Sequence, residues 1–460
     1  MAGVVESQLM RTLYLCYFGL REPLVQTQVL PYLRELSRGG IGVCLMTFEP
    51  EWGHSWPEPE RDEWRARLES EGIRWRALAY HKRPSLPATL YDIAAGALTA
   101  IRLIRRERVD VIHARGYVPA AMGALAKPWA NPWAKPGRRC KLIFDIRGFM
   151  AEEYVDAGVW PEGGLLYRLT KAAEKKLLEA ADGYVVLTEK ARKILFPADP
   201  LADPSNSREA GVSARPVEVI PCCVDAERFR AFDAESRDGL RRELNLEGRR
   251  VIVYVGALGG WYLTDEMAEL MAVARHEDAS TFSMVLTQSP PEMIIRRLNS
   301  LGMDQSDYLV KKVLPENVPR YLKAADFAVS LIKPCYSKMS SSPTKMAEYL
   351  ASGLPVISNA GIGDLDELIG EDKVGVILDD LNRESYRRAL EEMRRLLLEH
   401  GIAERCRDSA RNRFDLAGVG GVRYRRLYQR MGMGMGNGEM KRECRMDGMN
   451  GVSCKKGIER

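Results

Sequence analysis

The residue types best suited to chemistry gather in one segment, "SSSPTKMAEYLASGLPVISN", which runs from Ser340 to Asn359. Pro343 suits the first turn of a helix, and Ser342 suits the N-cap position before it. The spacing therefore predicts a helix over 343–352, followed by a short buried strand. Because the first backbone N–H groups of such a helix have no partner within it, its start is a potential anion-binding site.

Two charged side chains on this predicted helix extend the potential site. Lys345 would add a full positive charge near the free N–H groups. Glu348 lies three residues after Lys345 and four after Thr344, so all three share one face of the helix. A carboxylate cannot bind the anion itself, but it accepts hydrogen bonds from hydroxyl groups attached to that anion. The pattern fits a phosphate at the N–H groups and a ribose at Glu348; the alternative is an ordinary capped surface helix.

The segments that must position these residues alternate between strand and helix patterns. The predicted strands of a first unit lie at 11–19, 42–49, 73–80, 110–116, 141–149, 183–188 and 217–221. The pattern then restarts, with predicted strands at 251–260, 282–287, 308–314, 327–333, 355–359 and 374–378. This order favours two successive α/β units, each a parallel sheet covered by helices.

Ligands of open parallel sheets bind at the carboxyl ends of the strands, and in two-domain proteins they favour the cleft between the domains. Polar residues and glycines that follow predicted strands are therefore candidate site residues. In the first unit they are Tyr17, His113, Arg115, Asp145, Arg147 and Glu152. In the second unit they are Gly256, Gly259, Lys333 and the segment 340–348.

The composition is that of an ordinary globular protein of 460 residues, with 46% hydrophobic and 28% charged residues. The net charge of +5 does not call for nucleic acid as a partner, although it permits peripheral contact with an anionic membrane. The nine cysteines form no CxxC pair, which argues against a zinc site and a disulfide framework. Since no apolar run approaches the ~20 residues of a membrane span, we expect a cytoplasmic protein, with any membrane contact at the inner face.

Four stretches together resemble a known family: "VIPCCVD", "VIVYVGAL", "VPRYLKAADFAVSLIKP" and "SPTKMAEYLASGLPVISN". They are similar to motifs of the retaining nucleotide-sugar glycosyltransferases of the GT-B fold, in the group called family 4 or group 1. The resemblance covers residues 10–425, and "FDIRGFMAEEYVDAGVWPEGGLLYR" (144–168) resembles one subgroup. "VIPCCVDAERF" resembles the interdomain hinge of that group, with Cys222 and Cys223 where Asn-Gly is usual.

The resemblance implies two Rossmann-like domains that face each other across a cleft. Residues 1–224 would form the acceptor-side domain and residues 225–415 the donor domain. Residues 416–431 would form a helix that returns to the first domain, and the Gly- and Met-rich segment 432–460 is predicted to be a disordered tail. The implied reaction is transfer of a sugar from a nucleoside diphosphate to a glycan or lipid-linked acceptor, with retention of configuration and without a metal cofactor, in polysaccharide or glycolipid synthesis.

The resemblance also implies roles for particular residues. The expected donor-binding residues are Gly256, Gly259, Lys333, Ser341, Ser342, Thr344, Lys345 and Glu348. The expected catalytic residues are His113, Asp145 and Arg147.

Two features depart from the family pattern. Ser340 stands where the family has a Glu, eight positions before Glu348, and the loop "ALGGWYLTDE" lacks the usual Arg and Lys. We expect Lys333, Lys338 and Lys345, with the backbone N–H groups of 340–342, to take over binding of the diphosphate.

Other functions remain open at this level. A sugar-nucleotide epimerase shares the architecture, but the paired acid and base carboxylates it would need are not evident. A non-catalytic GT-B-like domain that binds a nucleotide sugar or a partner protein fits the two departures. An NAD-dependent dehydrogenase would need GxGxxG after the first strand, where this chain has "GLREPLVQ".

A basic helix end offers a hypothesis for membrane contact. The segment "IRLIRRER" (101–108) places Arg102, Arg105, Arg106 and Arg108 beside Ile101, Leu103 and Ile104. Such a segment could attach to an anionic leaflet. The alternative is a solvated helix end, with cations that complement the helix dipole.

Overall fold

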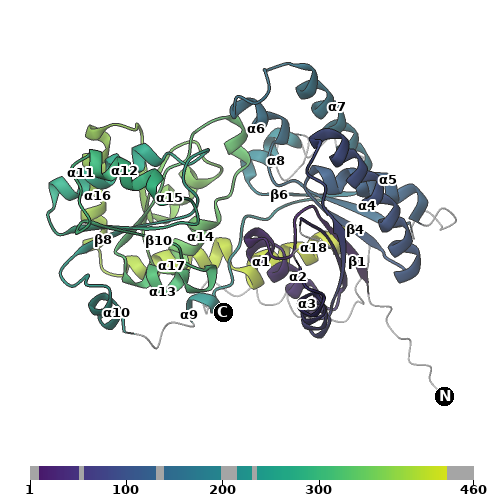
Figure 1. The fold of residues 1–460 in the computed structure, drawn as a ribbon, viewed down its shortest axis with the longest axis horizontal. Coiled ribbons are helices and arrows are strands. Elements are labelled where there is room, and N and C mark those ends of the chain that lie inside the picture. The colour runs from purple at the N-terminus through teal and green to yellow at the C-terminus, as the bar shows by residue number, and fades with distance from the viewer. Residues whose placement is uncertain (1–9, 51–55, 131–138, 198–214, 231–235, 432–460) are drawn as a thin grey trace, which may run out of the picture.

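The computed structural model describes residues 10–50, 56–130, 139–197, 215–230 and 236–431. These form two α/β domains, each with one parallel sheet (Figure 1). The prediction of two successive α/β units, each with a parallel sheet covered by helices, is confirmed. The predicted tail, 432–460, lies outside the described residues.

The first sheet has the strand order β3-β2-β1-β4-β5-β6-β7. Its strands are β1 (Arg11–Cys16), β2 (Gly42–Glu49), β3 (Ile73–Ala79), β4 (Val111–Arg115), β5 (Lys141–Asp145), β6 (Gly183–Val186) and β7 (Val217–Val219). Its helices are α1 (Pro23–Gln28), α2 (Leu30–Arg38), α3 (Glu58–Ser70), α4 (Ser85–Glu107), α5 (Tyr117–Ala130), α6 (Met150–Asp156), α7 (Leu165–Ala180) and α8 (Glu189–Leu195). Except in the edge strand β3, nearly every strand residue is buried, as expected for a parallel sheet covered on both faces.

The second sheet has the order β10-β9-β8-β11-β12-β13. Its strands are β8 (Arg250–Val255), β9 (Thr281–Leu286), β10 (Tyr308–Lys311), β11 (Phe327–Ser330), β12 (Val356–Asn359) and β13 (Gly375–Leu378). Its helices are α9 (Glu227–Arg230), α10 (Arg237–Glu243), α11 (Thr264–Glu277), α12 (Glu292–Ser300), α13 (Val318–Ala324), α14 (Thr344–Ala351), α15 (Leu365–Asp372), α16 (Arg383–Leu398) and α17 (Ile402–Phe414). In both sheets the strands are first added on one side of the first strand, β1 or β8, and then on its other side, beginning with β4 or β11. This change of side creates a binding crevice at the carboxyl ends of the strands.

The last helix, α18 (Val422–Arg430), leaves the second domain and packs into the first. Figure 1 shows it beside β1 and β4. Tyr424 and Tyr428 are each 1% exposed, and the Tyr428 hydroxyl lies 2.9 Å from Oγ1 of Thr12 in β1. The two ends of the described chain are thus joined in one core. None of the helices in the described ranges is both long and apolar enough to span a bilayer.

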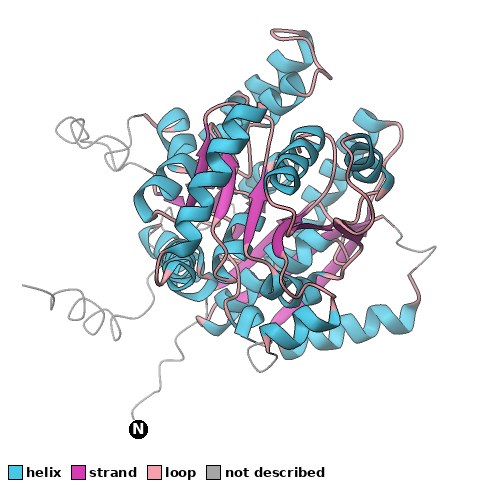
Figure 2. Cartoon of the chain, turned by 90° about the vertical axis from the view of Figure 1, so that its left-hand side faces the viewer, coloured by secondary structure: helices cyan, strands magenta, loops and turns pink. Residues whose placement is uncertain are grey.

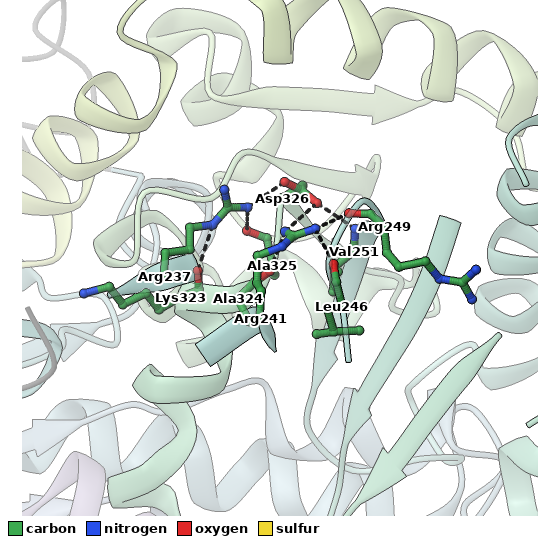
Figure 3. Close-up of polar contacts among 9 residues, drawn as sticks. All are labelled: Arg237, Arg241, Leu246, Arg249, Val251, Lys323, Ala324, Ala325 and Asp326. Atoms are coloured by element: carbon green, nitrogen blue, oxygen red, sulfur yellow. Dashed lines mark hydrogen bonds and ion pairs between the residues drawn. The ribbon is translucent and has the colours of Figure 1, made fainter. Parts of the chain in front are cut away.

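A cluster of arginines fixes the start of the second domain to its sheet (Figure 3). Arg241 of α10 donates to the carbonyl oxygens of Ala324 and Leu246, each at 3.0 Å, and contacts Asp326 at 3.3 Å. Asp326 also accepts the N–H of Val251 at 2.7 Å. Since the last carbonyls of α13 have no partner within that helix, the guanidinium groups satisfy them. The cluster therefore joins α10, α13, β8 and β11.

We expect Arg241→Ala to destabilise the second domain by about 2–3 kcal/mol, because it leaves the buried carbonyls of Ala324 and Leu246 without their donor and removes one of the two guanidinium partners of Asp326. Urea unfolding followed by tryptophan fluorescence would measure this change. Arg242→Ala, at the exposed neighbouring position, is the matched control and should change the free energy of unfolding by less than about 0.5 kcal/mol. Equal effects of the two substitutions would contradict the assignment.

Candidate active site

The two domains meet where the sequence predicted the cleft. The segment after β11, which contains the short helix η4 (Tyr336–Ser340), faces the loop after β5. The Phe149 N–H donates to Oγ of Ser340 at 3.2 Å, and the Cys222 N–H donates to Oγ of Ser342 at 3.0 Å. Backbone of the first domain and of the hinge is therefore hydrogen-bonded to hydroxyl groups of the second domain.

The start of α14 differs from the prediction in one respect. Its first helical residue is Thr344 and its N-cap is Pro343, with no side-chain cap. The expected N-cap role of Ser342 is wrong, because its hydroxyl accepts the Cys222 N–H instead. Ser341 lies in the same turn, and its N–H donates to the Lys338 carbonyl at 3.1 Å.

Lys345 is buried between two aromatic rings. Lys345 is only 7% exposed, and its Nζ lies 4.1 Å from the ring centroids of both Tyr254 and Tyr262. Among the described residues this Nζ has no hydrogen-bond partner. Burial lowers the pKa of Lys345 to about 7, although Glu348 raises it in part. A buried amine without a hydrogen-bond acceptor is a group prepared for a ligand.

Gly256 makes room for this lysine. It has a φ of 141°, and a Cβ atom at this position would lie 2.7 Å from Nζ of Lys345. Gly259 follows with a φ of 73°, and its N–H donates to Oγ1 of Thr264 at 2.8 Å. Both glycines therefore belong to a tight turn after β8 that a larger residue would strain.

Glu348 lies one turn after Lys345 on the same helix, as predicted from their spacing. Its side chain is 12% exposed, and Oε1 lies 3.7 Å from Nη1 of Arg228 in α9. Burial raises the pKa of Glu348, against the effect of the Arg228 and Lys345 charges. The structure thus brings together Gly256, Lys345 and Glu348 from β8 and α14, with Arg228 beside them.

The other two candidate lysines contact the first domain. Nζ of Lys333 donates to the Asp156 carbonyl at 3.4 Å, and Nζ of Lys338 lies 3.1 Å from Glu153. Lys338 also lies 4.0 Å above the Trp261 ring, in the loop that carries Tyr262. Diphosphate binding by these lysines stays a prediction. To bind the ligand, both lysines would have to give up their contacts with α6.

The three predicted catalytic residues lie at the ends of β4 and β5 in a buried charge cluster. His113 and Asp145 are both 0% exposed, with Nε2 of His113 3.7 Å from Oδ2 of Asp145. The Tyr424 hydroxyl donates to Asp145 at 3.1 Å, and Arg147 contacts it at 3.3 Å. Although burial opposes ionisation, Arg147, His113 and Arg115 hold the pKa of Asp145 well below its usual range. Burial lowers the pKa of His113.

The three predicted catalytic residues differ in whether a ligand in the cleft could reach them. Helix α18 covers His113, whose Nδ1 lies 3.1 Å from the Tyr428 hydroxyl. The Arg147 side chain is 15% exposed and also reaches Sγ of Cys222 in the hinge, at 3.5 Å. The contacts of His113 and Asp145 are those of a structural ion cluster, and their catalytic roles stay predictions.

Several residues of this region were not singled out from the sequence. They are Tyr254 and Tyr262 around Lys345, Arg228 beside Glu348, and Tyr424 and Tyr428 over the charge cluster. Arg228 lies within the hinge motif "VIPCCVDAERF", which is the sequence signal that could have indicated it. In the described ranges, no three His, Cys, Asp or Glu residues are grouped as metal ligands would be.

One large cavity lies at the hinge and not at Lys345. It has a volume of about 1,020 Å³ and is lined by residues of α2, α17 and the hinge, including Arg38, Asp225 and Arg407. A second cavity of about 600 Å³ reaches Ser341 and Ser342 from the side of α8. Neither of these two cavities is lined by Lys345 or Glu348, whereas the candidate donor residues Ser341 and Ser342 line the second.

Two family models match successive parts of the chain. The model of the glycosyl transferase 4-like domain matches residues 25–223, and that of glycosyl transferases group 1 matches residues 249–395. A D-inositol 3-phosphate glycosyltransferase of Salinispora tropica is 24% identical over 347 residues, which are 71% of this chain and 66% of that protein. Spore coat protein SA of Bacillus subtilis is 25% identical over 169 residues, 34% of this chain and 43% of that protein. The matched parts are thus under two thirds of the length of both relatives.

Solved structures share the fold. HepE of Anabaena, solved with UDP and glucose, superposes with a TM-score of 0.60 at 16% identity, covering 91% of this chain and 100% of that one. Sucrose-phosphate synthase of Thermosynechococcus elongatus gives 0.65 at 15% identity, covering 92% and 99%. A glycosyltransferase of Rickettsia africae gives 0.64 at 12% identity, covering 93% and 100%.

The buried amine of Lys345 predicts an unusual pH dependence of stability. Its pKa is about 7 in the folded chain and ~10.4 when unfolded, so between these values the unfolded chain binds more protons. Stability should therefore be lost as the pH falls from about 10 towards 7. Lys345→Met should stabilise the protein at pH 7 by up to about 4 kcal/mol, with a benefit that shrinks towards pH 10.

Thermal melts of both proteins across this pH range would measure the effect. Lys176→Met, at an exposed position of α7, is the control and should show no such pH-dependent difference. A destabilised Lys345→Met at pH 7 would show that the ammonium is already well solvated or paired.

Proposed function

Because this chain belongs to the GT-B-fold glycosyltransferases, we propose that it transfers a sugar from a nucleoside diphosphate to an acceptor with retention of configuration. The observation that carries the proposal is the group formed by Gly256, Lys345 and Glu348 at the carboxyl edge of the second sheet. The pathway we propose is synthesis of a glycan or a glycolipid.

The chemistry requires stabilisation of a leaving diphosphate. As the bond between the sugar and the diphosphate breaks, negative charge accumulates on the phosphate oxygens and positive charge on the sugar ring. In our proposal the ammonium of Lys345 and the N–H groups at the start of α14 face that negative charge. The protein's own cations carry this task, without a metal. The tight turn at Gly256 and Gly259 lets the diphosphate approach backbone.

Glu348 would then bind the nucleoside. Its carboxylate accepts hydrogen bonds from the two ribose hydroxyl groups, and the charge of Arg228 at 3.7 Å opposes the rise in its pKa that burial causes. A uridine nucleotide is the first donor to test, because HepE was solved with UDP and with UDP-glucose. The sugar and acceptor are to be found with a panel of nucleotide sugars, scored by thermal shift and by donor turnover.

A non-catalytic binding protein is the second candidate. Ser340, which replaces the family's Glu, is 2% exposed and donates its hydroxyl to the Ser337 carbonyl at 2.7 Å, while it accepts the Phe149 N–H. Ser340 therefore forms a hydrogen bond between the two domains. Binding of UDP without turnover of any nucleotide sugar in the panel would favour this candidate over the enzyme.

We expect Glu348→Ala to weaken nucleotide binding by roughly 1–3 kcal/mol, the range for a hydrogen bond to a charged group. Isothermal titration with UDP would measure it. Glu367→Ala, on the exposed face of α15, is the matched control and should leave the affinity unchanged. Unchanged affinity in Glu348→Ala would remove Glu348 from the site.

The affinity for UDP should also depend on pH. Since the pKa of Lys345 is about 7 in the free protein, the ammonium is lost as the pH rises from 6 to 8.5, and the affinity should fall over that range. Lys345→Met should bind more weakly and without this pH dependence. A variant that keeps the wild-type pH profile would show that another group is responsible.

A further inference from the structure

Large apolar side chains are exposed together on one helical layer of the first domain. The layer consists of α4, α5, α6 and α7, which cover one face of the sheet through the core of Leu103, Ala120 and Leu177. The exposed side chains are Leu86, Leu90, Tyr91, Leu98, Leu125, Trp129, Tyr154, Val159, Leu165, Leu166 and Leu169. A patch of this kind on a folded chain marks a surface that contacts something else.

The most exposed part of this layer is the hairpin formed by α6, the turn at 157–164 and α7. Figure 1 shows this turn at the top of the molecule, and Figure 2 shows that it projects beyond the domain body. Leu165 is 73% exposed, Val159 62%, Leu169 57% and Leu166 46%. The tip is therefore convex and apolar.

The way α7 docks fixes these leucines outward. On its inner face Glu174 accepts the Tyr117 hydroxyl at 2.7 Å, and Lys171 lies 2.9 Å from Glu152 of α6. Leu177, one turn further, is only 8% exposed. Because the inner face is held by buried polar contacts and apolar packing, the opposite face cannot rotate inward. The exposure of Leu165 and Leu169 is thus a fixed property of the fold.

Cations follow the leucines along the same outer face. Positions 165, 169, 172 and 176 form one stripe, which runs from two leucines to Lys176 about 10 Å beyond Leu169. Arg168 and Lys175 are exposed beside it. The acids on this side are Glu162 in the turn and Glu179 at the end of α7, against the cations Arg168, Lys175 and Lys176, so the excess of positive charge lies behind the tip. Apolar residues at a tip with cations behind them fit an anionic bilayer surface.

The hairpin is also tied to the cleft. Asp156, the last residue of α6, accepts the Ser337 N–H at 2.8 Å, and its carbonyl accepts Nζ of Lys333. Glu153 of the same helix pairs with Lys338. A membrane bound at the tip of the hairpin would therefore lie near the segment of the second domain that carries the candidate donor residues.

The basic segment 101–108 does not offer a comparable surface. Leu103 and Ile104 are 7% and 3% exposed, because they pack in the core under α4. Arg105 donates to the Trp129 carbonyl at 2.9 Å. The sequence hypothesis placed membrane contact there, whereas Leu165 and Val159 of α7 and its turn are 73% and 62% exposed.

We propose that the α6–α7 hairpin inserts its tip, residues 157–169, into the surface of an anionic bilayer and so holds the cleft over a lipid-linked acceptor. The contact with the bilayer stands on the hairpin alone, whereas the nature of the acceptor rests on the proposed transfer reaction. A convex tip flanked by cations fits a fluid interface. A protein partner would instead be expected to find a concave or flat matching surface.

The test compares the full chain with two double variants in vesicle sedimentation. Leu165→Glu with Leu169→Glu removes the apolar tip, and Lys175→Glu with Lys176→Glu reverses the charge behind it. Leu398→Glu is the matched control, since Leu398 is 87% exposed on α16 of the other domain. The vesicles contain phosphatidylcholine alone or with about a third phosphatidylglycerol, at low and high salt.

We expect the wild type to sediment with the anionic vesicles and to be released in part by salt. Both double variants should lose at least about fivefold in bound fraction, while Leu398→Glu should bind as the wild type does. Melting temperatures within a few degrees of the wild type would show that all variants are folded, as expected for exposed positions.

The contrary outcomes are distinct. A wild type that stays in the supernatant at low salt, or a tip variant that binds like the wild type, overturns the proposal. A wild-type dimer in light scattering that becomes monomeric in the leucine variant would identify the face as a contact between two copies, which also overturns it. Calorimetry with UDP is run in parallel, so that a failure of donor binding is told apart from a failure of membrane binding.

Discussion

One buried carboxylate, Asp145, holds together three parts of the chain that are far apart in sequence. It forms an ion pair with Arg147 and lies near Arg115 and His113, and it accepts a hydrogen bond from Tyr424 of the last helix. An unpaired carboxylate in this position would be very costly, so these groups must stay in place for the fold to be stable. Through Arg147 and Cys222 the same cluster reaches the hinge. The ends of β4 and β5, the hinge and α18 are thus mutually dependent.

This dependence sets the relation between the two domains. Because α18 is anchored in the first domain and follows α17 of the second, the chain crosses between the domains twice, at the hinge and before α18. The cleft side is joined by hydroxyl-to-backbone bonds at Ser340 and Ser342 and by the contacts of α6 with Lys333 and Lys338. Neutral hydrogen bonds and partly exposed ion pairs are individually weak, so the domains can separate on that side while the hinge side stays anchored.

The sequence predicted the fold better than the site. Apolar runs bounded by turn residues predict the observed bounds of β2, 42–49, and those of α14 within one residue at each end. These elements depend on local pattern. The burial of His113 and Asp145 depends on Tyr424 and Tyr428, which come some 280 to 315 residues later. Local pattern carries no information about such a cover, so residues at strand ends were interpreted as cleft residues when a distant helix encloses them.

The aromatic rings of the donor loop explain how it can lack the Arg and Lys that are usual in its family. The loop "ALGGWYLTDE" has no cation of its own, yet Trp261 and Tyr262 hold Lys338 and Lys345 at 4.0 and 4.1 Å from their ring centroids. The loop therefore binds cations that η4 and α14 supply, through the negative faces of its rings. Lys345 gains from Tyr254 a second such face and from Gly256 the space to reach it. The positive charge that the family pattern places on the loop is, in this chain, brought to it by η4 and α14 of the same domain.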